Sequence, residues 1–367
     1  MEIITDAIQN EQFFLLSKIR MKKVAVIIVN WNGRRFLENC LNSLSAQTYH
    51  PIKIYFVDNG SDDTSVAFVE KAYSHVTLIR NSSNLGFAEA NNQGIKAALA
   101  DPEISHIALL NNDTEVDPDW LNSLLQGMQT DTTIGVAASK IYNFTQRDII
   151  DSVGDSFSRT TGRVRNRGHN ERDEGQYELF EEVFAACAAA CLIRRETLED
   201  ICMDGSYFDT DFGSYIEDVD LCIRARLAGW TCWYVPTARV YHVGSGTSSR
   251  LVRTWKYSIS QRNRIFTVIK NMPFPYVVVL LFHYLIPIRD AAYVALKLFP
   301  FLRRFRTNPA APIESSLSIQ DVGYVYVQGT LGALRLLPKM LKKRRIIQRS
   351  RVISNNEVRR WFRELAL

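Results

Sequence analysis

Apolar and polar positions along the first third of the chain fall into two kinds of segment. Short, mostly apolar runs end in polar turns, as buried parallel strands do, at residues 22–33, 52–63, 76–81 and 106–116. Helical patterns lie between them, at residues 35–47, 64–73 and 88–100. This repetition predicts an α/β, doubly wound domain with a mostly parallel sheet, in which ligands bind beyond the carboxyl ends of the strands.

Clustered amides and acids mark the ends of three predicted strands. Asn30 and Asn32 follow the first strand, Asp58 follows the second, and the segment from Asn111 to Asp113 lies where the last strand gives way to a loop. Asn and Asp also form ordinary turns, so one such strand end would mean little. Three strand ends of this kind in one sheet favour a binding cleft.

Residues 212–230 predict an amphipathic helix with three carboxylates in its first turn, Glu217, Asp218 and Asp220. Apolar residues recur at helical spacing on its other face, at Ile216, Val219, Ile223 and Leu227. Acidic residues suit a helix N-terminus, where they meet exposed N–H groups and the positive end of the dipole. This preference by itself accounts for the acids, so a chemical role has to come from the rest of the chain.

The middle of the chain is less regular. Residues 158–176 are polar and basic without periodicity, which predicts a mobile surface loop. Residues 183–196 are small and apolar, and we expect them to be buried and to let the backbone approach a ligand or a neighbouring element closely. A strand-like run at residues 232–240 ends just before His242.

Charge is divided unevenly along the chain. Residues 1–250 hold 23 Lys and Arg against 34 Asp and Glu, whereas residues 251–367 hold 21 against 5. A basic tail on an acidic body suggests an anionic partner: a membrane surface, a nucleic acid or a phosphate-bearing ligand. The six cysteines lack CxxC spacing and residues 1–20 lack the pattern of a signal peptide, so we expect reduced thiols, no structural zinc and a cytoplasmic protein.

The basic tail is also apolar. Residues 274–288 form an apolar run of about 15 residues, short of the roughly 20 that span a bilayer, and residues 333–352 mix Leu and Ile with Lys and Arg. We therefore predict segments that lie in the membrane interface, with basic side chains against anionic headgroups. The alternative is a helical subdomain that packs on the body or forms a homodimer. We expect no nucleic acid partner, because no recognised nucleic-acid module is present.

Six motifs occur in the order typical of family 2 glycosyltransferases with the GT-A fold: VAVIIVNWNG, VDNGSDDTS, NLGFAEANNQG, LLNNDTEV, YIEDVDLCIRARLAGW and YHVGSGTSS. The chain most resembles the branch of rhamnosyltransferases, and the resemblance covers roughly residues 22–270. It implies a GT-A domain there, a Rossmann-like, mostly parallel sheet flanked by helices. Residues 1–21 are then an N-terminal extension, and residues 271–367 a basic, amphipathic helical extension associated with the membrane.

The resemblance also implies a site for a dTDP- or UDP-linked sugar. Asp58 corresponds to the residue that accepts a hydrogen bond from N3–H of uracil or thymine, although an Asx turn before Gly60 explains the same placement. Asn91 departs from the family pattern, where an Arg often stands. The implied nucleotide-sugar contacts are Asn30, Asn32, Asp58, Arg80, Asn84, Gly86, Asn92, Asn111 and Asn112.

A divalent cation, Mg²⁺ or Mn²⁺, is implied by the same resemblance. Residues 111–113 occupy the place of the Asp-x-Asp motif, with Asn111 in place of the first carboxylate and Asp113 as the metal ligand. His242 corresponds to a histidine that completes the metal site in several relatives. Carboxylate and phosphate oxygens suit these hard ions. The stretch from Gly244 to Ser249 then serves as a flexible lid over the donor.

The three acids of residues 212–230 take separate roles under the resemblance. Asp218 corresponds to the base that deprotonates the acceptor hydroxyl, Glu217 binds and orients that hydroxyl, and Asp220 is structural. We expect the helix N-terminus to keep Asp218 ionised. Transfer then proceeds with inversion and without a covalent sugar–enzyme intermediate.

Our leading hypothesis is an inverting glycosyltransferase, peripherally bound at the cytoplasmic face of the cell membrane. It moves rhamnose from dTDP-rhamnose to a lipid-linked saccharide or a growing polysaccharide of the cell wall or lipopolysaccharide kind. The alternatives are a transferase of another UDP- or dTDP-sugar (galactofuranose, GlcNAc or glucose) and a non-catalytic scaffold that binds nucleotide sugars. A nucleotidyltransferase is disfavoured because residues 30–36, NWNGRRF, are not the Gly-rich basic loop that such enzymes place after the first strand.

Overall fold

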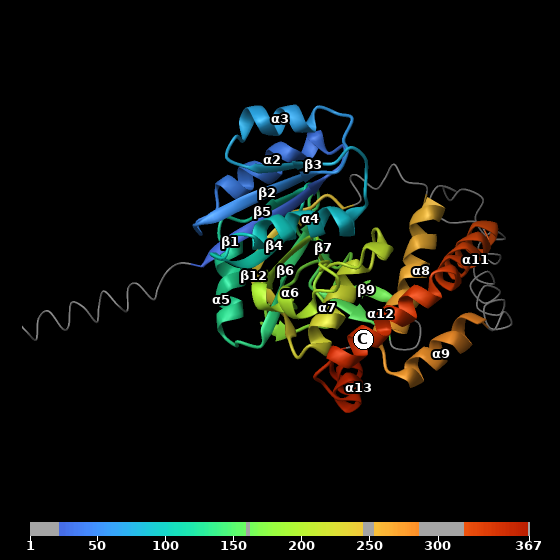
Figure 1. Ribbon diagram of the computed structural model, residues 1–367. Coiled ribbons are helices and arrows are strands. Elements are labelled where there is room, and N and C mark those ends of the chain that lie inside the picture. Colours follow the sequence, from blue (N-terminus) through green and yellow to red (C-terminus); the bar gives the residue numbers. More distant parts are fainter. Residues whose placement is uncertain (1–21, 159–161, 245–252, 286–318, 366–367) are drawn as a thin grey trace, which may run out of the picture.

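The computed structural model describes residues 22–158, 162–244, 253–285 and 319–365. The predicted extension 1–21 and all of the predicted lid except Gly244 lie outside the described residues. One large sheet runs through the molecule, with helices on both of its faces (Figure 1). The structure therefore confirms the predicted α/β fold with a mostly parallel sheet.

The strands follow the order β10-β12-β6-β11-β4-β1-β2-β3, with β5 paired to β12 and β7 to β6. Their bounds are β1 Lys23–Asn30, β2 Ile52–Asp58, β3 Thr77–Arg80, β4 Ile104–Asn111, β5 Thr114–Val116, β6 Ile134–Asn143, β7 Ile150–Ser152, β10 Glu181–Glu182, β11 Ala190–Arg194 and β12 Thr231–His242. The predicted strands β1 to β4 form one parallel half of the sheet. β11 joins this half to the parallel pair β6 and β12, and it is antiparallel to both β4 and β6.

The sheet is buried between two apolar cores, which explains the continuous apolar runs. Along β1, Val26 and Ile28 belong to one core and Ile27 to the other, and all three are fully buried. The first core also takes side chains from α2 Arg34–Ser45, α3 Ser65–Ala72 and α5 Trp120–Gln129. The second takes them from α4 Phe87–Leu99, α6 Arg195–Ile201 and α7 Glu217–Leu227.

Two segments differ from their predicted form. The run 106–116 is not one strand: β4 ends at Asn111, and β5 begins at Thr114 and pairs with β12. Residues 158–176 are not all loop, because β9 Val164–Asn166 pairs with β8 Asp155–Phe157 in a separate hairpin.

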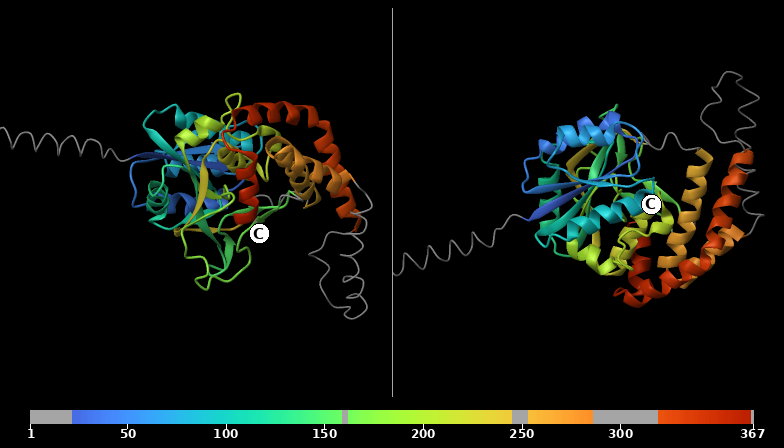
Figure 2. Two further views of the ribbon diagram at one scale, coloured as in Figure 1. Left: turned by 90° about the horizontal axis from the view of Figure 1, so that it is seen from below. Right: turned by 45° about the horizontal axis from the view of Figure 1, so that its top comes forward.

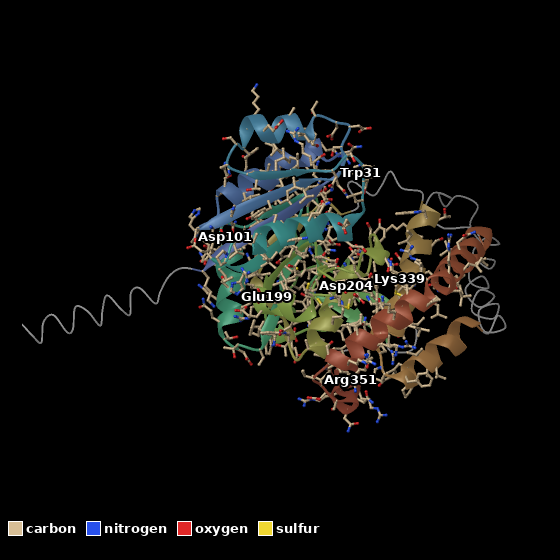
Figure 3. The ribbon with its side chains drawn as sticks, viewed as in Figure 1. Trp31, Asp101, Glu199, Asp204, Lys339 and Arg351 are labelled. Carbon is tan, nitrogen blue, oxygen red and sulfur yellow. The ribbon has the colours of Figure 1, made fainter. Side chains whose placement is uncertain are left out.

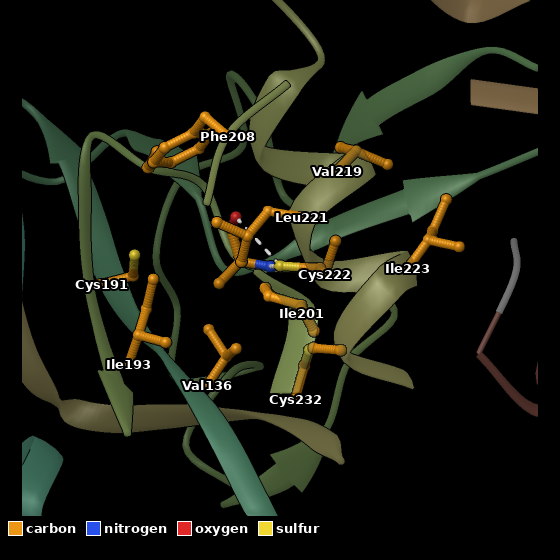
Figure 4. Close-up of a cluster of buried hydrophobic side chains, with 14 of the residues drawn as sticks. Val136, Cys191, Ile193, Ile201, Phe208, Val219, Leu221, Cys222, Ile223 and Cys232 are labelled. Carbon is orange, nitrogen blue, oxygen red and sulfur yellow. Dashed lines mark hydrogen bonds between the residues drawn. The ribbon is translucent and has the colours of Figure 1, made fainter. Parts of the chain in front are cut away.

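The helix α7 packs against the sheet through its apolar side. Val219 and Ile223 lie in the core that contains Val136 and Ile193, and the backbone N–H of Ala186 donates to the sulfur of Cys222 (Figure 4). All six cysteines are free thiols, and four of them are buried: Cys40, Cys191, Cys222 and Cys232. The expectation of unpaired, mostly buried thiols is confirmed.

The C-terminal helices pack on the sheet domain and on one another. They are α8 Arg253–Asn271, α9 Phe274–Leu285, α11 Ile319–Arg335, α12 Leu337–Ser350 and α13 Asn355–Glu364. α8 lies alongside α11 and α12 and contacts α7 (Figure 2). Phe362 of α13 packs on Phe157 and Phe184, and the N–H of Val352 donates to the carbonyl of Leu227. None of the helices in the described ranges is long and apolar enough to cross a membrane.

A buried ion-pair network joins α7 to α8. Lys270 of α8 contacts Asp209 and lies 2.9 Å from Asp220 Oδ1, and all three side chains are fully buried. Asp220 also accepts hydrogen bonds from Arg224 at 3.0 Å and Asn271 at 2.8 Å. The prediction that Asp220 is structural fits this placement, and its partners come from α8 as well as from its own helix.

The network predicts a large effect of one substitution on stability. Lys270→Met leaves two buried carboxylates without their shared cation, and breaking a buried pair in this way costs about 3–5 kcal/mol. We expect urea unfolding to show a loss of this size in the free energy of unfolding. Lys342→Met removes an exposed lysine of α12 and should change that free energy by less than about 0.5 kcal/mol. Equal losses in the two variants would contradict a stabilising role for the network.

Candidate active site

A cavity of about 1080 Å³ opens at the carboxyl ends of β1 and β4. Its walls come from those strand ends, the start of α4, the hairpin β8–β9, the segment 210–218 and α8. Trp31, which directly follows β1, lies at this edge of the sheet (Figure 3). The position agrees with the rule that ligands of doubly wound sheets bind beyond the strand ends.

Asn59 fixes the loop before α4. Its amide donates to Asn84 Oδ1 at 3.0 Å, and its oxygen accepts the N–H of Leu85 at 3.0 Å. Gly86, at φ +87°, begins the helix, and a Cβ there would lie 3.1 Å from the carbonyl oxygen of Gly213. The close approach therefore requires glycine. The N-terminus of α4 opens on the cavity, and such helix ends favour anions such as phosphate.

Asn30 and Asp58 belong to a hydrogen-bonded network beneath the cavity. Asn112 donates to Asn30 Oδ1 at 2.7 Å, and Asn30 donates to Asp58 Oδ1 at 3.0 Å. Asp58 also accepts the hydroxyl of Ser61 at 2.6 Å and its N–H at 3.0 Å. The local turn that the sequence offered as the alternative for Asp58 is present, and its carboxylate already accepts three hydrogen bonds from the protein.

Asn92 and Arg80 have partners away from the cavity. The oxygen of Asn92 accepts the N–H groups of Tyr207 and Phe208, and its amide donates to the carbonyl of Phe208. Asn92 thus ties α4 to the chain ahead of α7. Arg80 forms a surface ion pair with Glu70.

The predicted nucleotide-sugar residues therefore divide into two groups. Four line the cavity: Asn84, Gly86, Asn111 and Asn112. Five do not line it: Asn30, Asn32, Asp58, Arg80 and Asn92. Asn32, in the second group, donates its N–H to Ser61 and accepts the N–H of Asp62. The first group thus borders the space in which a ligand would lie, whereas Asn30, Asn32, Asp58 and Asn92 hold the surrounding loops and Arg80 pairs at the surface.

Asp113 and His242, the two predicted metal ligands, lie next to each other at one edge of the cavity. His242 Nε2 lies 3.3 Å from Asp113 Oδ1 and 3.3 Å from the amide nitrogen of Asn111. His242 Nδ1 lies 2.8 Å from Asp151 Oδ2, a partner that sequence reasoning missed. Burial alone would lower the pKa of His242, but the hydrogen bonds to Asp113 and Asp151 raise it to about 10.

This cluster fits a divalent cation. A carboxylate oxygen and an imidazole nitrogen meet at one edge of the cavity, and both atom types are common metal ligands. A carboxylate on the other ring nitrogen, here Asp151, orients a ligating histidine in many metal sites. The residues that could hold the cation are Asp113 and His242, and the amide nitrogen of Asn111 lies beside the ring of His242.

An unusual backbone brings Glu217 and Asp218 to the cavity. Tyr215 and Ile216 have φ values of 71° and 70°, in the left-handed region that β-branched residues such as isoleucine rarely adopt. Asn263 of α8 holds this turn, because its amide lies 2.7 Å from the carbonyl oxygen of Tyr215 and 3.0 Å from that of Ser214. The strain is therefore sustained by a side chain from another element.

The Asp218 carboxylate is fixed by two backbone N–H groups. Ala188 donates to Oδ2 at 3.1 Å and Val219 to Oδ1 at 2.8 Å. Burial raises the pKa of Asp218 above its ordinary value, and these hydrogen bonds offset only part of that effect. Desolvation therefore acts against the helix N-terminus, which we expected to keep Asp218 ionised. Burial and the charge of Asp218 also raise the pKa of Glu217.

Asp155 of β8 is a second carboxylate that the sequence did not single out. It lines the cavity, and its ligand atom, the sulfur of Cys187 and a carboxylate oxygen of Asp218 all lie within 4.8 Å of one another. Asp151 and Asp155 both lie in a short stretch, 149–157, of alternating apolar and acidic or small residues. Their position on two short strands that follow β6 is the signal by which the sequence could have identified Asp151 and Asp155.

The family model for glycosyl transferase family 2 matches residues 25–202. The N-acetylglucosaminyl-diphospho-decaprenol L-rhamnosyltransferase of Mycobacterium tuberculosis is 26% identical over 246 residues, which are 61% of this chain and 77% of that protein. The match thus includes most of the relative's length.

Two solved structures have a similar fold. GalNAc-T7 with UDP, GalNAc and Mn²⁺ has a TM-score of 0.56 at 16% identity, covering 72% of this chain and 50% of that one. S. aureus TarS 1–349 in complex with UDP-GlcNAc has a TM-score of 0.52 at 15% identity, and the match covers 93% of this chain and 92% of that one. This chain therefore spans about half of the first structure and most of the second. The expected GT-A fold is confirmed.

Proposed function

The chain carries a domain of glycosyl transferase family 2, and on this basis we propose that it is an inverting glycosyltransferase. It moves a sugar from a nucleotide-diphosphate donor to the hydroxyl of a saccharide acceptor. The observation that carries the proposal is the composition of one cavity. The pair Asp113 and His242, the N-terminus of α4 and the carboxylates of Glu217 and Asp218 all open on it.

The donor diphosphate lies between α4 and the Asp113–His242 pair in this proposal. The N-terminus of α4 and the loop at Asn84 and Gly86 line the cavity on this side, where the positive end of the helix dipole favours the anionic oxygens. Asp113 and His242 would hold a divalent cation, Mg²⁺ or Mn²⁺, which would supply positive charge to the departing diphosphate when bound. Asp151 keeps the imidazole in the orientation that this requires.

Asp218 is the general base of the proposed reaction. The N–H groups of Ala188 and Val219 hold its carboxylate in place, and the raised pKa strengthens it as a proton acceptor. Its partner Glu217 accepts a hydrogen bond from the acceptor and orients the attacking hydroxyl. The hydroxyl attacks the anomeric carbon in one displacement, so the anomeric configuration inverts.

For the donor we propose dTDP-rhamnose, and for the acceptor a lipid-linked saccharide. Both follow the rhamnosyltransferase relative, whose name states an N-acetylglucosaminyl-diphospho-decaprenol substrate. Other UDP- and dTDP-sugars are the competing donors, because thymine and uracil share the same N3–H edge. Purified protein should be incubated with each nucleotide sugar, Mn²⁺ and N-acetylglucosaminyl diphosphate on a short prenyl chain, and the release of nucleotide diphosphate measured.

Asp218→Asn tests the base directly. General base catalysis contributes about 10²–10⁴-fold, so kcat for the preferred donor should fall by about that factor while its KM stays unchanged. Asp204→Asn makes the same change on an exposed turn and should leave both constants unaltered. A variant of Asp218 with wild-type turnover would remove it as the base. If wild-type protein releases nucleotide from no donor, the non-catalytic alternative stands.

Asp151→Asn tests the orientation of His242. Loss of an orienting carboxylate typically weakens a metal site about 10–100-fold. The Mn²⁺ concentration for half-maximal activity should rise by that factor, and EDTA should abolish the activity of the wild-type enzyme. Asp148→Asn changes an exposed acid three residues away and should leave the Mn²⁺ requirement as it is. Full activity of the wild type in EDTA would refute the proposed cation.

We also propose that the basic tail binds the inner face of the cell membrane through α12. The exposed residues of this helix include two apolar and three basic ones: Leu341, Ile346, Lys342, Arg345 and Arg349. Apolar and basic side chains mixed on one exposed helix suit the interface of an anionic bilayer, and each basic residue there is worth about 1 kcal/mol. The surface would hold the cavity near an acceptor embedded in the membrane.

Flotation with vesicles tests this surface. Wild-type protein should float with vesicles that contain anionic lipid. The double variant Arg345→Glu, Arg349→Glu should remain unbound in the bottom fraction. The double variant Lys71→Glu, Lys96→Glu changes the net charge equally on exposed parts of α3 and α4 and should still float. Failure of the wild type to float, or equal loss in both double variants, would overturn the membrane surface.

A further inference from the structure

Two carboxylate oxygens near α7 lack hydrogen-bond partners among the residues that the structure describes. They are Asp155 Oδ1 and Glu217 Oε2, and each side chain belongs to a residue only 5% exposed. Both residues line the cavity. Because buried acceptors are nearly always paired in folded proteins, two unpaired ones in one cavity indicate that a ligand supplies the donors.

The backbone around Asp155 is rigidly held. Asp155 pairs with Asn166 across the β8–β9 hairpin, and its N–H donates to the carbonyl of Ala185 at 2.8 Å. The N–H of Ala185 donates back to the carbonyl of Asp155 at 3.2 Å. The carboxylate thus enters the cavity from an element other than α7, within 4.8 Å of an Asp218 oxygen.

Hydroxyl groups suit this position better than a metal ion does. The third ligand-type atom of the cluster is the sulfur of Cys187, a soft donor, whereas Mg²⁺ and Mn²⁺ select oxygen. A sugar ring offers several neighbouring O–H donors, and two carboxylates this close together can each accept one of them. Hydrogen bonds to charged acceptors are also the stronger kind.

We propose that Asp155 is a specificity-determining residue of the acceptor subsite. It accepts a hydrogen bond from a ring hydroxyl next to the one that Asp218 deprotonates, while Glu217 accepts from a further donor of the same sugar. The inference rests on the proposed function, because it requires a saccharide acceptor in this part of the cavity. It adds a residue from the β8–β9 hairpin to the pair on α7.

Asp155→Asn tests the subsite with N-acetylglucosaminyl diphosphate on a short prenyl chain. The asparagine keeps one accepting oxygen but replaces the carboxylate by a weaker amide acceptor and an NH₂ group, which corresponds to about a tenfold loss of acceptor affinity or more. The KM for this acceptor should rise by about tenfold or more. The KM for the donor, the Mn²⁺ requirement and the slow hydrolysis of donor without acceptor should stay unchanged. Asp148→Asn, on the exposed segment before β7, is the matched control and should leave the acceptor KM unchanged.

Acceptor analogues that each lack one ring hydroxyl provide a second readout, which does not depend on how well the variant folds. Wild-type enzyme should lose about tenfold in kcat/KM for one of these analogues, and the Asp155 variant should no longer discriminate against that analogue. Wild-type enzyme that treats every analogue alike refutes the subsite. A variant whose Mn²⁺ requirement rises while its acceptor KM does not would instead make the cluster a cation site, which also refutes it.

The two levels of the proposal fail in different ways. If wild-type enzyme transfers no sugar to any acceptor, the proposed function fails and the inference fails with it. If wild-type enzyme transfers sugar and Asp155→Asn keeps the wild-type acceptor KM, the inference alone fails.

Discussion

The first turn of α7 carries three carboxylates, of which Glu217 and Asp220 are buried and Asp218 is partly buried, and the rest of the site depends on how each is satisfied. Burying a charge is costly unless it is paired. Asp220 is paired by Lys270, Arg224 and Asn271, so it anchors the helix. Among the residues that the structure describes, no cation pairs with Glu217 or Asp218, and burial raises the pKa of both. The helix thus carries one acid that is paired and anchors it, Asp220, and two acids that remain available to a ligand, Glu217 and Asp218.

The C-terminal helices take part in this arrangement directly. Lys270 and Asn263 both lie on α8, and they hold α7 and the left-handed turn ahead of it. From α12, Lys343 contacts Asp209 and Asp211 at the base of the same segment, and Lys339, labelled in Figure 3, lies 2.6 Å from Asp211. The basic tail therefore supports the wall of the cavity with Lys343 and with Lys339, whose side chain is half exposed. The basic residues that we propose for membrane contact, such as Arg345 and Arg349, lie further along the same helix.

Sequence patterns predicted the parts of the molecule that local chemistry determines. Continuous apolar runs identified β1 to β4 because both faces of a parallel sheet are covered. The polar strand ends located Asn111 to Asp113 and, with His242 and α7, the residues that the cavity brings together. The same residue types also hold loops, and sequence alone did not distinguish Asn84 at the cavity from Asn92 beneath it.

What the sequence could not supply depends on contacts between distant elements. Asp151 meets His242 across 91 residues, and Lys270 meets Asp220 across 50. The raised pKa of Asp218 follows from burial, which the helix pattern does not contain. The domain boundary predicted at residue 270 came from the family resemblance. In the structure this residue lies within α8, which packs against α7, α11 and α12.

Asp218 as the base of a single displacement is the central claim, and the stereochemistry of the product tests it most directly. Wild-type enzyme should be supplied with a donor of known anomeric configuration, and the new glycosidic bond should be characterised by NMR. A single displacement predicts a product whose configuration is opposite to that of the donor. A product that retains the configuration of the donor would contradict the role given to Asp218 and would require a different reaction course in this cavity.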